Sequence, residues 1–362
     1  MKRLAGIFER VVAFDNLWLA FRKARRGKRR RPPVAEFELN LERELLALQR
    51  ELRAEDYQPG AYRLFTVYER KPRLIAAAPF RDRIVHHALL NVIEPALDRR
   101  FIFDSYACRA GKGTHAAVAR YQDWSRRYAY ALKMDIARYF PSIDRDLLKE
   151  KLRRHLKDAK VLRLLDRIID GGPSFPEDGP PEYFPGDGLL TPLERRRGLP
   201  IGNLTSKFFA NLFLDGFDNY VKEQLGIVPY LRYVDDMVML DDDKGRLAEL
   251  RALAAERLGQ DRLRLHPRKA NIVPVRCGLD FLGYTVFPHR RRLRNDNGWR
   301  FVRKYRGFAR AYAEGKLDWD DFNPCVQSWI GHASHADTWG LRERIFSGTL
   351  FVRGAGRTAA GG

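Results

Sequence analysis

The feature that most constrains the fold of this chain is an apolar run, residues 230–240, that is interrupted by charged residues. The charged members of this run are Arg232 and the adjacent pair Asp235-Asp236. A turn at the two aspartates that joins two short strands explains the pattern better than one strand or one helix does. The chain is therefore expected to form a hairpin whose tip carries two neighbouring carboxylates.

A second strand that ends in an aspartate is predicted at residues 130–136, where apolar side chains alternate with smaller or polar ones around Asp135. If this strand pairs with the hairpin, three carboxylates meet at one rim of a sheet and repel each other. Mg²⁺ relieves such repulsion, because it is held by one or two carboxylates plus substrate phosphates. An Asp-Asp pair alone is common in turns for backbone reasons. The three carboxylates together favour phosphoryl transfer with two metal ions.

Helical periodicity surrounds these strands. Helices are predicted at residues 14–26, 41–52, 83–97 and 247–258, and more than one between Asp144 and Gly171. Asn40 is the expected cap of the second helix, and Pro95 lies near the end of the third. One long helix is predicted from Thr205 to about Val221. Residues 171–198 contain six prolines and six glycines, which predicts a long loop or insertion. Residues 279–286 read as a strand pair. The order predicts an α+β layer, with helices packed on one side of a small antiparallel sheet.

The charge of the chain indicates a polyanionic partner. Lys and Arg total 67 and Asp and Glu total 46, so the net charge is 67 − 46 = +21. Nucleic acid is the first candidate partner, although an Arg-rich composition also follows from a GC-rich genome or a hot habitat. A ribosome-associated binding protein has similar charge. With three cysteines, no apolar stretch of about 18 residues and no secretory signal, we expect a cytoplasmic protein with no membrane span.

Several segments resemble the motifs of one enzyme family. Tyr233-Val234-Asp235-Asp236 is similar to the tyrosine-x-Asp-Asp signature of reverse transcriptases. Similar matches to the family's motifs are residues 132–144 (first catalytic motif), 198–206 (nucleotide and template binding), 265–270 (lysine-bearing motif), 281–284 (primer grip), and 79–87 and 105–114 (fingers). The resemblance covers roughly residues 17–346, in the family's order.

The resemblance implies a right-hand polymerase, an α+β fold with fingers, a palm that bears a small antiparallel sheet, and a helical thumb. The expected parts are N-terminal basic helices (1–60), fingers (61–131), palm (132–290, with the Pro/Gly-rich insertion 171–198), thumb (291–350) and a disordered tail (351–362). It also implies RNA-directed DNA polymerase activity that uses template RNA, a primer or cDNA, and dNTPs.

The resemblance assigns roles to individual residues. Asp135, Asp235 and Asp236 correspond to the catalytic metal-binding triad, and the carbonyl of Ile136 completes the shell of one of two Mg²⁺ ions, with Mn²⁺ as an alternative. Lys269 corresponds to a lysine proposed to protonate the leaving pyrophosphate; the alternative is an exposed lysine in a turn.

Other positions correspond to nucleotide and primer contacts. Lys71 and Arg73, with Arg81 as a weaker candidate, match residues that clamp the incoming triphosphate. Phe140 matches the aromatic gate that collides with a ribose 2′-hydroxyl, and its alternative is a core aromatic before Pro141. Ile201 and Gly202 are expected against the nascent base pair, and Phe281, Leu282, Gly283 and Tyr284 in the primer grip.

The pattern Ile201-Gly202-Asn203, with Ser206, resembles the enzymes of bacterial and phage diversity-generating retroelements, which miscopy template adenines. Many accurate reverse transcriptases have Gln at the position of Ile201. That group implies a small basic helical accessory protein as a partner. Alternatives are another bacterial reverse transcriptase, either group II intron-like or defence-associated, and a catalytically silent RNA-binding protein. His332 and His335 lack the cysteine pair of a zinc site and are interpreted as structural.

Overall fold

The structure is a computed structural model that describes residues 3–68, 72–173 and 181–353. The chain forms two compact units that are interleaved along the sequence. The first unit contains Met1–Gly113, Lys133–Met239 and Ala248–Asn271, and the second contains Thr114–Leu132, Leu240–Leu247 and Ile272–Gly362. The assignment of fingers, palm and thumb to the residue ranges given above stays a prediction, and the expected disordered tail lies largely outside the described residues.

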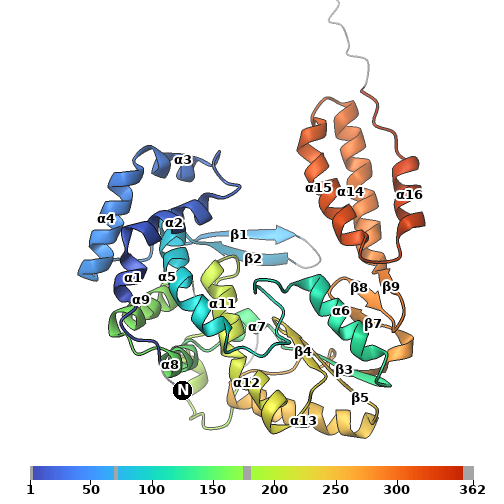
Figure 1. The fold of residues 1–362 in the computed structure, drawn as a ribbon, viewed down its shortest axis with the longest axis horizontal. Coiled ribbons are helices and arrows are strands. Elements are labelled where there is room, and N and C mark those ends of the chain that lie inside the picture. Colours follow the sequence, from blue (N-terminus) through green and yellow to red (C-terminus); the bar gives the residue numbers. More distant parts are fainter. Residues whose placement is uncertain (1–2, 69–71, 174–180, 354–362) are drawn as a thin grey trace, which may run out of the picture. The chain divides into compact units, whose positions relative to one another are not determined.

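The N-terminal helices of the first unit pack on one another and on one long helix (Figure 1). They are α1 (Phe8–Val12), α2 (Phe14–Arg25), α3 (Pro32–Leu39) and α4 (Leu41–Ala54), and the long helix is α5 (Phe80–Asp98). Phe21, Phe37 and Phe80 bring α2, α3 and α5 together, with ring centroids 5.4 to 6.1 Å apart. Pro95 lies inside α5 near its end, as the sequence predicted. One local prediction is corrected: Asn40 precedes α4, but its side chain makes no capping hydrogen bond.

Two strands of the first unit form a separate antiparallel hairpin. Strand β1 (Arg63–Tyr68) pairs with β2 (Pro72–Ala77), in a register that runs from Arg63 opposite Ala77 to Tyr68 opposite Pro72. Most side chains of β1 are exposed, whereas the end of β2 is buried at Ala76. Lys71 lies outside the described residues.

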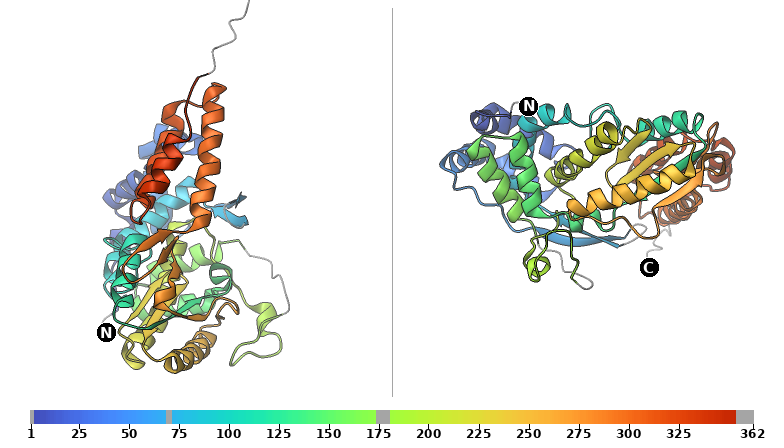
Figure 2. Two further views of the ribbon diagram at one scale, coloured as in Figure 1. Left: turned by 90° about the vertical axis from the view of Figure 1, so that its right-hand side faces the viewer. Right: turned by 90° about the horizontal axis from the view of Figure 1, so that it is seen from below.

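The main sheet contains three strands that the sequence predicted, β3 (Tyr130–Asp135), β4 (Tyr230–Tyr233) and β5 (Asp236–Asp241), and one that it did not, β6 (Asn271–Pro274). These strands are arranged in the order β4-β5-β3-β6. Leu132, Met134 and Val238 are fully buried in it, and α13 (Lys244–Gln260) runs along the sheet (Figures 1 and 2). This order places the strand that ends in Asp135 beside the strand that begins with Asp236.

The helices around this sheet differ from the prediction at one point. Helices α7 (Tyr139–Ser142), α8 (Arg145–His155) and α9 (Ala159–Asp170) follow β3, and Asp144 caps α8 through its carboxylate. The predicted single helix from Thr205 is wrong: α11 (Leu204–Phe213) ends at Leu214, and α12 (Asp215–Asn219) and a π-helical segment (Tyr220–Gln224) follow. Apolar side chains occur on both sides of this break, so their spacing alone does not reveal it.

The Pro/Gly-rich segment is mostly irregular where it is described, with one short helix, α10 (Thr191–Glu194). It is nevertheless anchored. Arg195 forms ion pairs with Asp187 and, at 3.5 Å, with Asp144, and all three side chains are almost completely buried. The segment is therefore tied to the residue that caps α8.

The second unit combines one helix, a three-stranded sheet and a helical bundle. It contains α6 (Thr114–Ser125), a 3-10 turn (Val275–Cys277), β7 (Leu279–Phe281), β8 (Tyr284–Val286), β9 (Arg291–Leu293), α14 (Asn295–Ala313), α15 (Trp319–Ala333) and α16 (Trp339–Ser347). Phe301 and Trp329 join α14 to α15 through parallel rings whose centroids are 3.8 Å apart. The mixture of helices and small sheets confirms the predicted α+β class. Among the described residues, no helix combines the length and apolarity that a membrane span requires.

Candidate active site

The turn between β4 and β5 presents the Asp235-Asp236 pair. Tyr233 pairs with Asp236 in the antiparallel register, so Val234 and Asp235 form the connecting turn. Val234 has φ +57°, in the left-handed region. That region is unfavourable for a β-branched residue, and such strain occurs mostly at functional sites that the surrounding structure holds in place. The tip of this hairpin is therefore held in a specific conformation.

A buried ion pair supports this turn from below. Arg232 and Asp218 are both 0% exposed, and their closest atoms, Nη2 and Oδ2, lie 2.6 Å apart. Arg232 also donates to the carbonyl of Val234, at 3.0 Å, and to the side chain of Asn211, at 3.2 Å. Burial opposes the charged guanidinium, but Asp218 outweighs it and raises the pKa of Arg232. The hydrogen bond to Val234 links this pair directly to the left-handed turn residue.

The third carboxylate, Asp135, lies within electrostatic reach of the turn. Burial, followed by the nearby carboxylates of Asp236 and Asp135, raises the pKa of Asp235 to about 6. Burial also raises the pKa of Asp236, in spite of an opposing effect from Lys133. The structure thus brings together the three aspartates that the sequence singled out, and all three belong to the first unit.

Two lysines accompany the carboxylates. The Nζ atom of Lys269 lies 2.8 Å from Oδ2 of Asp135, and that of Lys133 lies 3.3 Å from Oδ1 of Asp236. Sequence reasoning proposed Lys269 but missed Lys133. Its signal was present, because Lys133 is a long cationic residue within a strand that otherwise has apolar and small side chains before Asp135. These ammonium groups offset part of the negative charge.

The backbone around Ile136 positions Lys269. Ile136 pairs with Leu265 in an isolated antiparallel bridge. The amide of His266 donates to the carbonyl of Asp135 at 2.7 Å, and the amide of Ala137 donates to that of Arg264 at 2.8 Å. These two hydrogen bonds involve the residues on either side of Ile136, and the Ile136 carbonyl takes part in neither of them. They hold the segment that carries Lys269 against the end of β3.

The ligand chemistry of this cluster suits a hard divalent cation. Its negatively charged donors are all carboxylates, and Mg²⁺ prefers oxygen ligands. As the side chains stand, the described part of the chain contains no group of three His, Cys, Asp or Glu side chains arranged to hold a metal ion. The repulsion that raises the pKa of Asp235 is nevertheless the interaction that a bound cation relieves. By donor type and charge, the residues fit such an ion.

Phe140 follows β3 in the chain and is hydrogen-bonded to the segment that precedes Ile201. It lies in α7 and is half-buried, whereas its neighbour Tyr139 is 2% exposed. The Phe140 carbonyl accepts a hydrogen bond from the amide of Leu199 at 2.9 Å. Of the two adjacent aromatic residues, Tyr139 therefore belongs to the core, and Phe140 keeps an accessible surface.

The segment Ile201-Gly202-Asn203 is clamped to β2. The Ile201 carbonyl accepts from the amide of Ala76 at 3.0 Å. The Asn203 side chain donates to the Ala76 carbonyl at 3.0 Å and accepts from the amide of Ala78 at 3.3 Å. Gly202 has φ +114°, and a Cβ there would lie 2.9 Å from Cγ2 of Ile75, so the close approach requires glycine. Asn203 was not among the predicted site residues.

The two described residues that the sequence predicted to bind the triphosphate, Arg73 and Arg81, lie on different elements. Arg73 is exposed on β2, opposite Val67. Arg81 forms an ion pair with Glu51 of α4, at 2.6 Å. Arg81 therefore neutralises an acidic residue of the N-terminal helices in this structure.

The predicted primer grip forms the tip of a hairpin in the second unit. Phe281 pairs with Tyr284, so Leu282 and Gly283 form a two-residue turn in which both φ angles are positive, +49° and +95°. Such a turn matches the twist of a hairpin. The Tyr284 hydroxyl lies 2.9 Å from Nδ1 of His332 and 3.1 Å from Nε2 of His115. These contacts join β8 to α6 and α15, which agrees with a structural role for His332.

Comparison with known proteins gives this geometry a context. Residues 66–286 match the family described as reverse transcriptase (RNA-dependent DNA polymerase). Protein YkfC of Escherichia coli (strain K12) is 27% identical over 291 residues, which are 69% of this chain and 72% of that protein. Nuclear intron maturase 1, mitochondrial, of Arabidopsis thaliana is 31% identical over 25% of this chain. The putative COX1/OXI3 intron 1 protein of Saccharomyces cerevisiae (strain ATCC 204508 / S288c) is 20% identical over 41% of it. The matched segments span 13% and 16% of these last two proteins.

Proposed function

The chain belongs to the reverse transcriptase family of RNA-directed DNA polymerases, and we propose that it synthesises cDNA on an RNA template at Asp135, Asp235 and Asp236. The convergence of these three carboxylates at the strained β4–β5 turn carries the proposal. The substrates are template RNA, a primer or growing cDNA, and dNTPs. The net charge of +21 supports a polyanionic substrate.

The carboxylates, together with the Ile136 carbonyl, are the proposed ligands of two Mg²⁺ ions, with Mn²⁺ as an alternative. When bound, such ions activate the attacking 3′-hydroxyl and stabilise the leaving oxygen of the pyrophosphate. Arg232 and Asp218 hold the Asp235 backbone through the turn at Val234. Lys269, beside Asp135, is the proposed proton donor to the pyrophosphate.

The remaining proposed roles concern the nucleotide. Lys71 and Arg73, and less directly Arg81, are proposed to bind the triphosphate of the incoming dNTP. The accessible face of Phe140 supports its role as a steric gate against a ribose 2′-hydroxyl. Ile201 and Gly202 are proposed to face the nascent base pair, and Phe281 to Tyr284 the primer strand.

Within the family, we propose the diversity-generating subgroup, in which copying is error-prone opposite adenine. Ile201 supports this assignment, because it offers bulk and apolar contact where Gln could hydrogen-bond the nucleotide. Losing one positioning contact slows correct insertion more than incorrect insertion, and each factor of ten in discrimination corresponds to about 1.4 kcal/mol. A small basic helical accessory protein is a proposed partner.

A group II intron-like enzyme is the second candidate. The similarity to an intron maturase and to a protein encoded in a yeast intron favours it. Sequencing of cDNA made from one RNA by the wild type and by Ile201→Gln separates the candidates. Errors concentrated opposite adenine in the wild type, and reduced in the variant, support the diversity-generating assignment. Low, evenly spread errors in both proteins reject it and leave an ordinary reverse transcriptase, for which the intron-like enzyme is the candidate.

The polymerase proposal is tested by primer extension on primed RNA with dNTPs and Mg²⁺. Asp235→Asn should lower the extension rate by about a thousandfold or more, because it removes one carboxylate from the proposed metal site. RNA binding, measured in parallel, should change little. Asp320→Asn, an exposed aspartate at the start of α15, is the matched control. RNA binding without extension by the wild type identifies instead a catalytically silent RNA-binding protein.

A further inference from the structure

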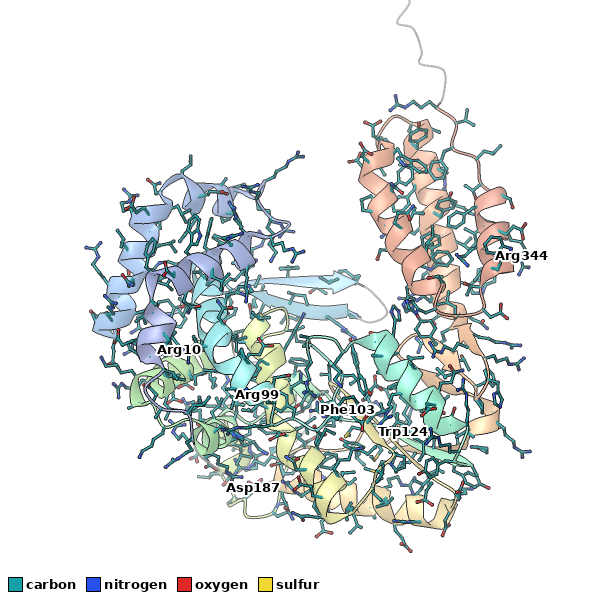
Figure 3. The ribbon with its side chains drawn as sticks, viewed as in Figure 1. Arg10, Arg99, Phe103, Trp124, Asp187 and Arg344 are labelled. Atoms are coloured by element: carbon teal, nitrogen blue, oxygen red, sulfur yellow. The ribbon has the colours of Figure 1, made fainter. Side chains whose placement is uncertain are left out.

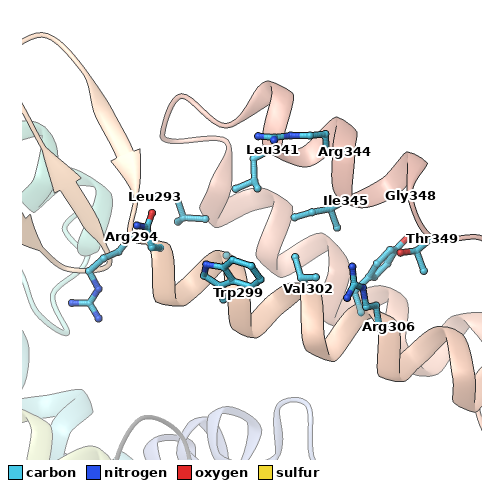
Figure 4. Close-up of a pocket in the computed structure, with 13 residues that line it drawn as sticks. Leu293, Arg294, Trp299, Val302, Arg306, Leu341, Arg344, Ile345, Gly348 and Thr349 are labelled. Atoms are coloured by element: carbon cyan, nitrogen blue, oxygen red, sulfur yellow. The ribbon is translucent and has the colours of Figure 1, made fainter.

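A pocket of about 410 Å³ lies within the second unit, between α14 and α16 (Figure 4). This volume falls in the range of roughly 300–1,000 Å³ that is typical of small-molecule sites. Leu293, Tyr305 and Ile345, which line it, are each less than 9% exposed. None of the residues proposed above for catalysis or nucleotide binding lines the pocket.

The rim of the pocket combines a flat aromatic side chain with cations. Trp299 of α14 lines the pocket and is 75% exposed. Arg306 of α14 and Arg344 of α16 are exposed and lie on the same rim (Figure 4). Figure 3 shows Arg344 on α16. Neither of these two arginines forms an ion pair with any acid that the structure describes, whereas Arg294, also at the rim, is paired with Asp296 at 2.7 Å. Two positive charges at the rim are therefore available to a ligand.

Polar groups that can form directional hydrogen bonds complete the lining. Asn295 contributes a carboxamide, which has both donors and acceptors, and Thr349 contributes a hydroxyl. An exposed tryptophan, nearby guanidinium groups and such hydrogen-bonding groups form the combination that binds single-stranded nucleic acid. Bases stack on aromatic rings, arginines neutralise phosphates, and polar side chains contact base edges.

We propose that this pocket binds one unpaired nucleotide of single-stranded RNA, with its base against Trp299 and its phosphates at Arg306 and Arg344. The proposal rests on the RNA-templated function above and adds to it a contact for RNA outside the primer duplex. An acidic protein segment also matches the arginines. The exposed indole favours the nucleotide, because stacking requires the flat face that a base offers and a carboxylate does not.

The experiment uses the full chain and measures binding by fluorescence anisotropy. The probes are a labelled single-stranded RNA of about 12 nucleotides, within the site sizes of known single-strand binders, and a blunt RNA–DNA hybrid of the same sequence. Trp299→Ala should weaken binding of the single strand about tenfold and binding of the hybrid by less than about twofold. Arg306→Gln should lower the slope of log affinity against log salt by about 0.7 for the single strand.

The chain offers matched controls for both variants. Trp339 is 72% exposed at the start of α16 but does not line the pocket, so Trp339→Ala should leave binding unchanged. Arg303, exposed on α14 and also outside the lining, is the control for Arg306. Val302→Phe fills the pocket with a larger apolar side chain and should weaken single-strand binding as Trp299→Ala does. With 5-iodouridine in the probe, ultraviolet cross-linking should label Trp299 in the wild type and not in Val302→Phe.

Three outcomes overturn the proposal. One is unchanged single-strand binding in Trp299→Ala and Val302→Phe. Another is an equal loss of affinity for the single strand and for the hybrid, which indicates a contact with the duplex. The third is that a labelled acidic peptide binds the wild type but not Trp299→Ala and is displaced by poly-glutamate, while the substitution leaves RNA binding unchanged. This result indicates a protein partner. The binding measurements need neither dNTPs nor Mg²⁺, so their outcome is independent of whether the protein extends primers.

Discussion

The ammonium group of Lys269 lies 2.8 Å from a carboxylate oxygen of Asp135, although 134 residues separate them in the sequence. Lys269 is exposed and Asp135 is half-buried, so the pair is open to solvent on the side of the lysine. A cation in this position can neutralise the carboxylate in the free enzyme. It is also close enough to the proposed reaction centre to deliver a proton.

Substitution of Lys269 tests that second role. Lys269→Ala should lower the rate of nucleotide addition by about a hundredfold, the lower end of the contribution of a positioned general acid. Binding of primed RNA should change by less than about twofold, because one exposed cation of many is lost. Single-turnover extension measures the rate, and Arg268→Ala, the exposed neighbour, is the control. Equal rates in the wild type and Lys269→Ala would remove Lys269 from the chemistry.

Phe140→Ala tests the steric gate. The accessible face of Phe140 should exclude a ribose 2′-hydroxyl by contact alone, so the smaller side chain should admit ribonucleotides. The ratio of rNTP to dNTP incorporation should rise by at least about tenfold, while incorporation of dNTP stays close to that of the wild type. An unchanged ratio together with reduced thermal stability would place Phe140 in the core.

Gly202→Ala tests the clamp between β2 and the Ile201 segment. The new Cβ would lie 2.9 Å from Cγ2 of Ile75, and φ +114° is strained for any side chain. The free energy of unfolding should fall by about 1–3 kcal/mol. Gly259→Ala in α13, where a Cβ meets nothing within 4 Å, should instead gain up to about 1 kcal/mol from its helical position. Urea unfolding measures the change in the free energy of unfolding in both variants. Equal changes in the two variants would show that Gly202 is an ordinary loop residue.

Arg232→Met tests the buried ion pair that supports the β4–β5 turn. It leaves the Asp218 carboxylate buried without its cation, which typically costs about 3–5 kcal/mol of stability. The double variant Arg232→Met with Asp218→Leu should recover much of this loss in urea unfolding. It should not recover primer extension, because the hydrogen bond to the Val234 carbonyl is still missing. Full recovery of extension in the double variant would show that Arg232 supports stability alone.

His86 gives the fold a pH dependence that can be isolated. It is 1% exposed in α5, and burial, followed by the charges of His87 and Arg83, lowers its pKa to about 3. The unfolded chain has the ordinary value of about 6.5, so between these values the unfolded state binds the extra proton. This contribution to stability is complete above pH 6.5 and declines as the pH falls toward 3. From pH 7 to pH 5 the loss should be about 2 kcal/mol.

The measurement compares urea unfolding of the wild type and His86→Gln at pH 7 and pH 5. The variant has no proton to gain at this position, so its stability should fall by about 2 kcal/mol less than that of the wild type. His87 remains in both proteins and cancels in the difference. His289→Gln, at an exposed position, should behave as the wild type. Parallel pH dependences in the wild type and His86→Gln would contradict the prediction.

The local patterns of the sequence were sufficient to predict the β3 strand, the β4–β5 hairpin and the aspartates at their ends. Alternating side chains before Asp135, and an apolar run broken at Asp235-Asp236, have few other structural solutions, because backbone hydrogen bonding restricts such segments to a strand or a helix. The family motifs added the lysine of residues 265–270 and the proposed steric gate at Phe140. The break in the helix at Leu214 was missed, because the apolar spacing continues through it.

Contacts between distant residues required the tertiary structure. Nothing in the sequence pairs Lys133 with Asp236, Arg232 with Asp218, or Asn203 with the backbone of Ala76 and Ala78. The strands and loops bring these groups within 3.5 Å only after the chain has folded. The sequence by itself determined which charged groups are present, namely three carboxylates at predicted strand ends in a basic chain, because residue types and local periodicity can be read directly from it. The tertiary structure decided which cations neutralise those carboxylates and which backbone is strained, because both depend on packing between segments that are remote along the chain.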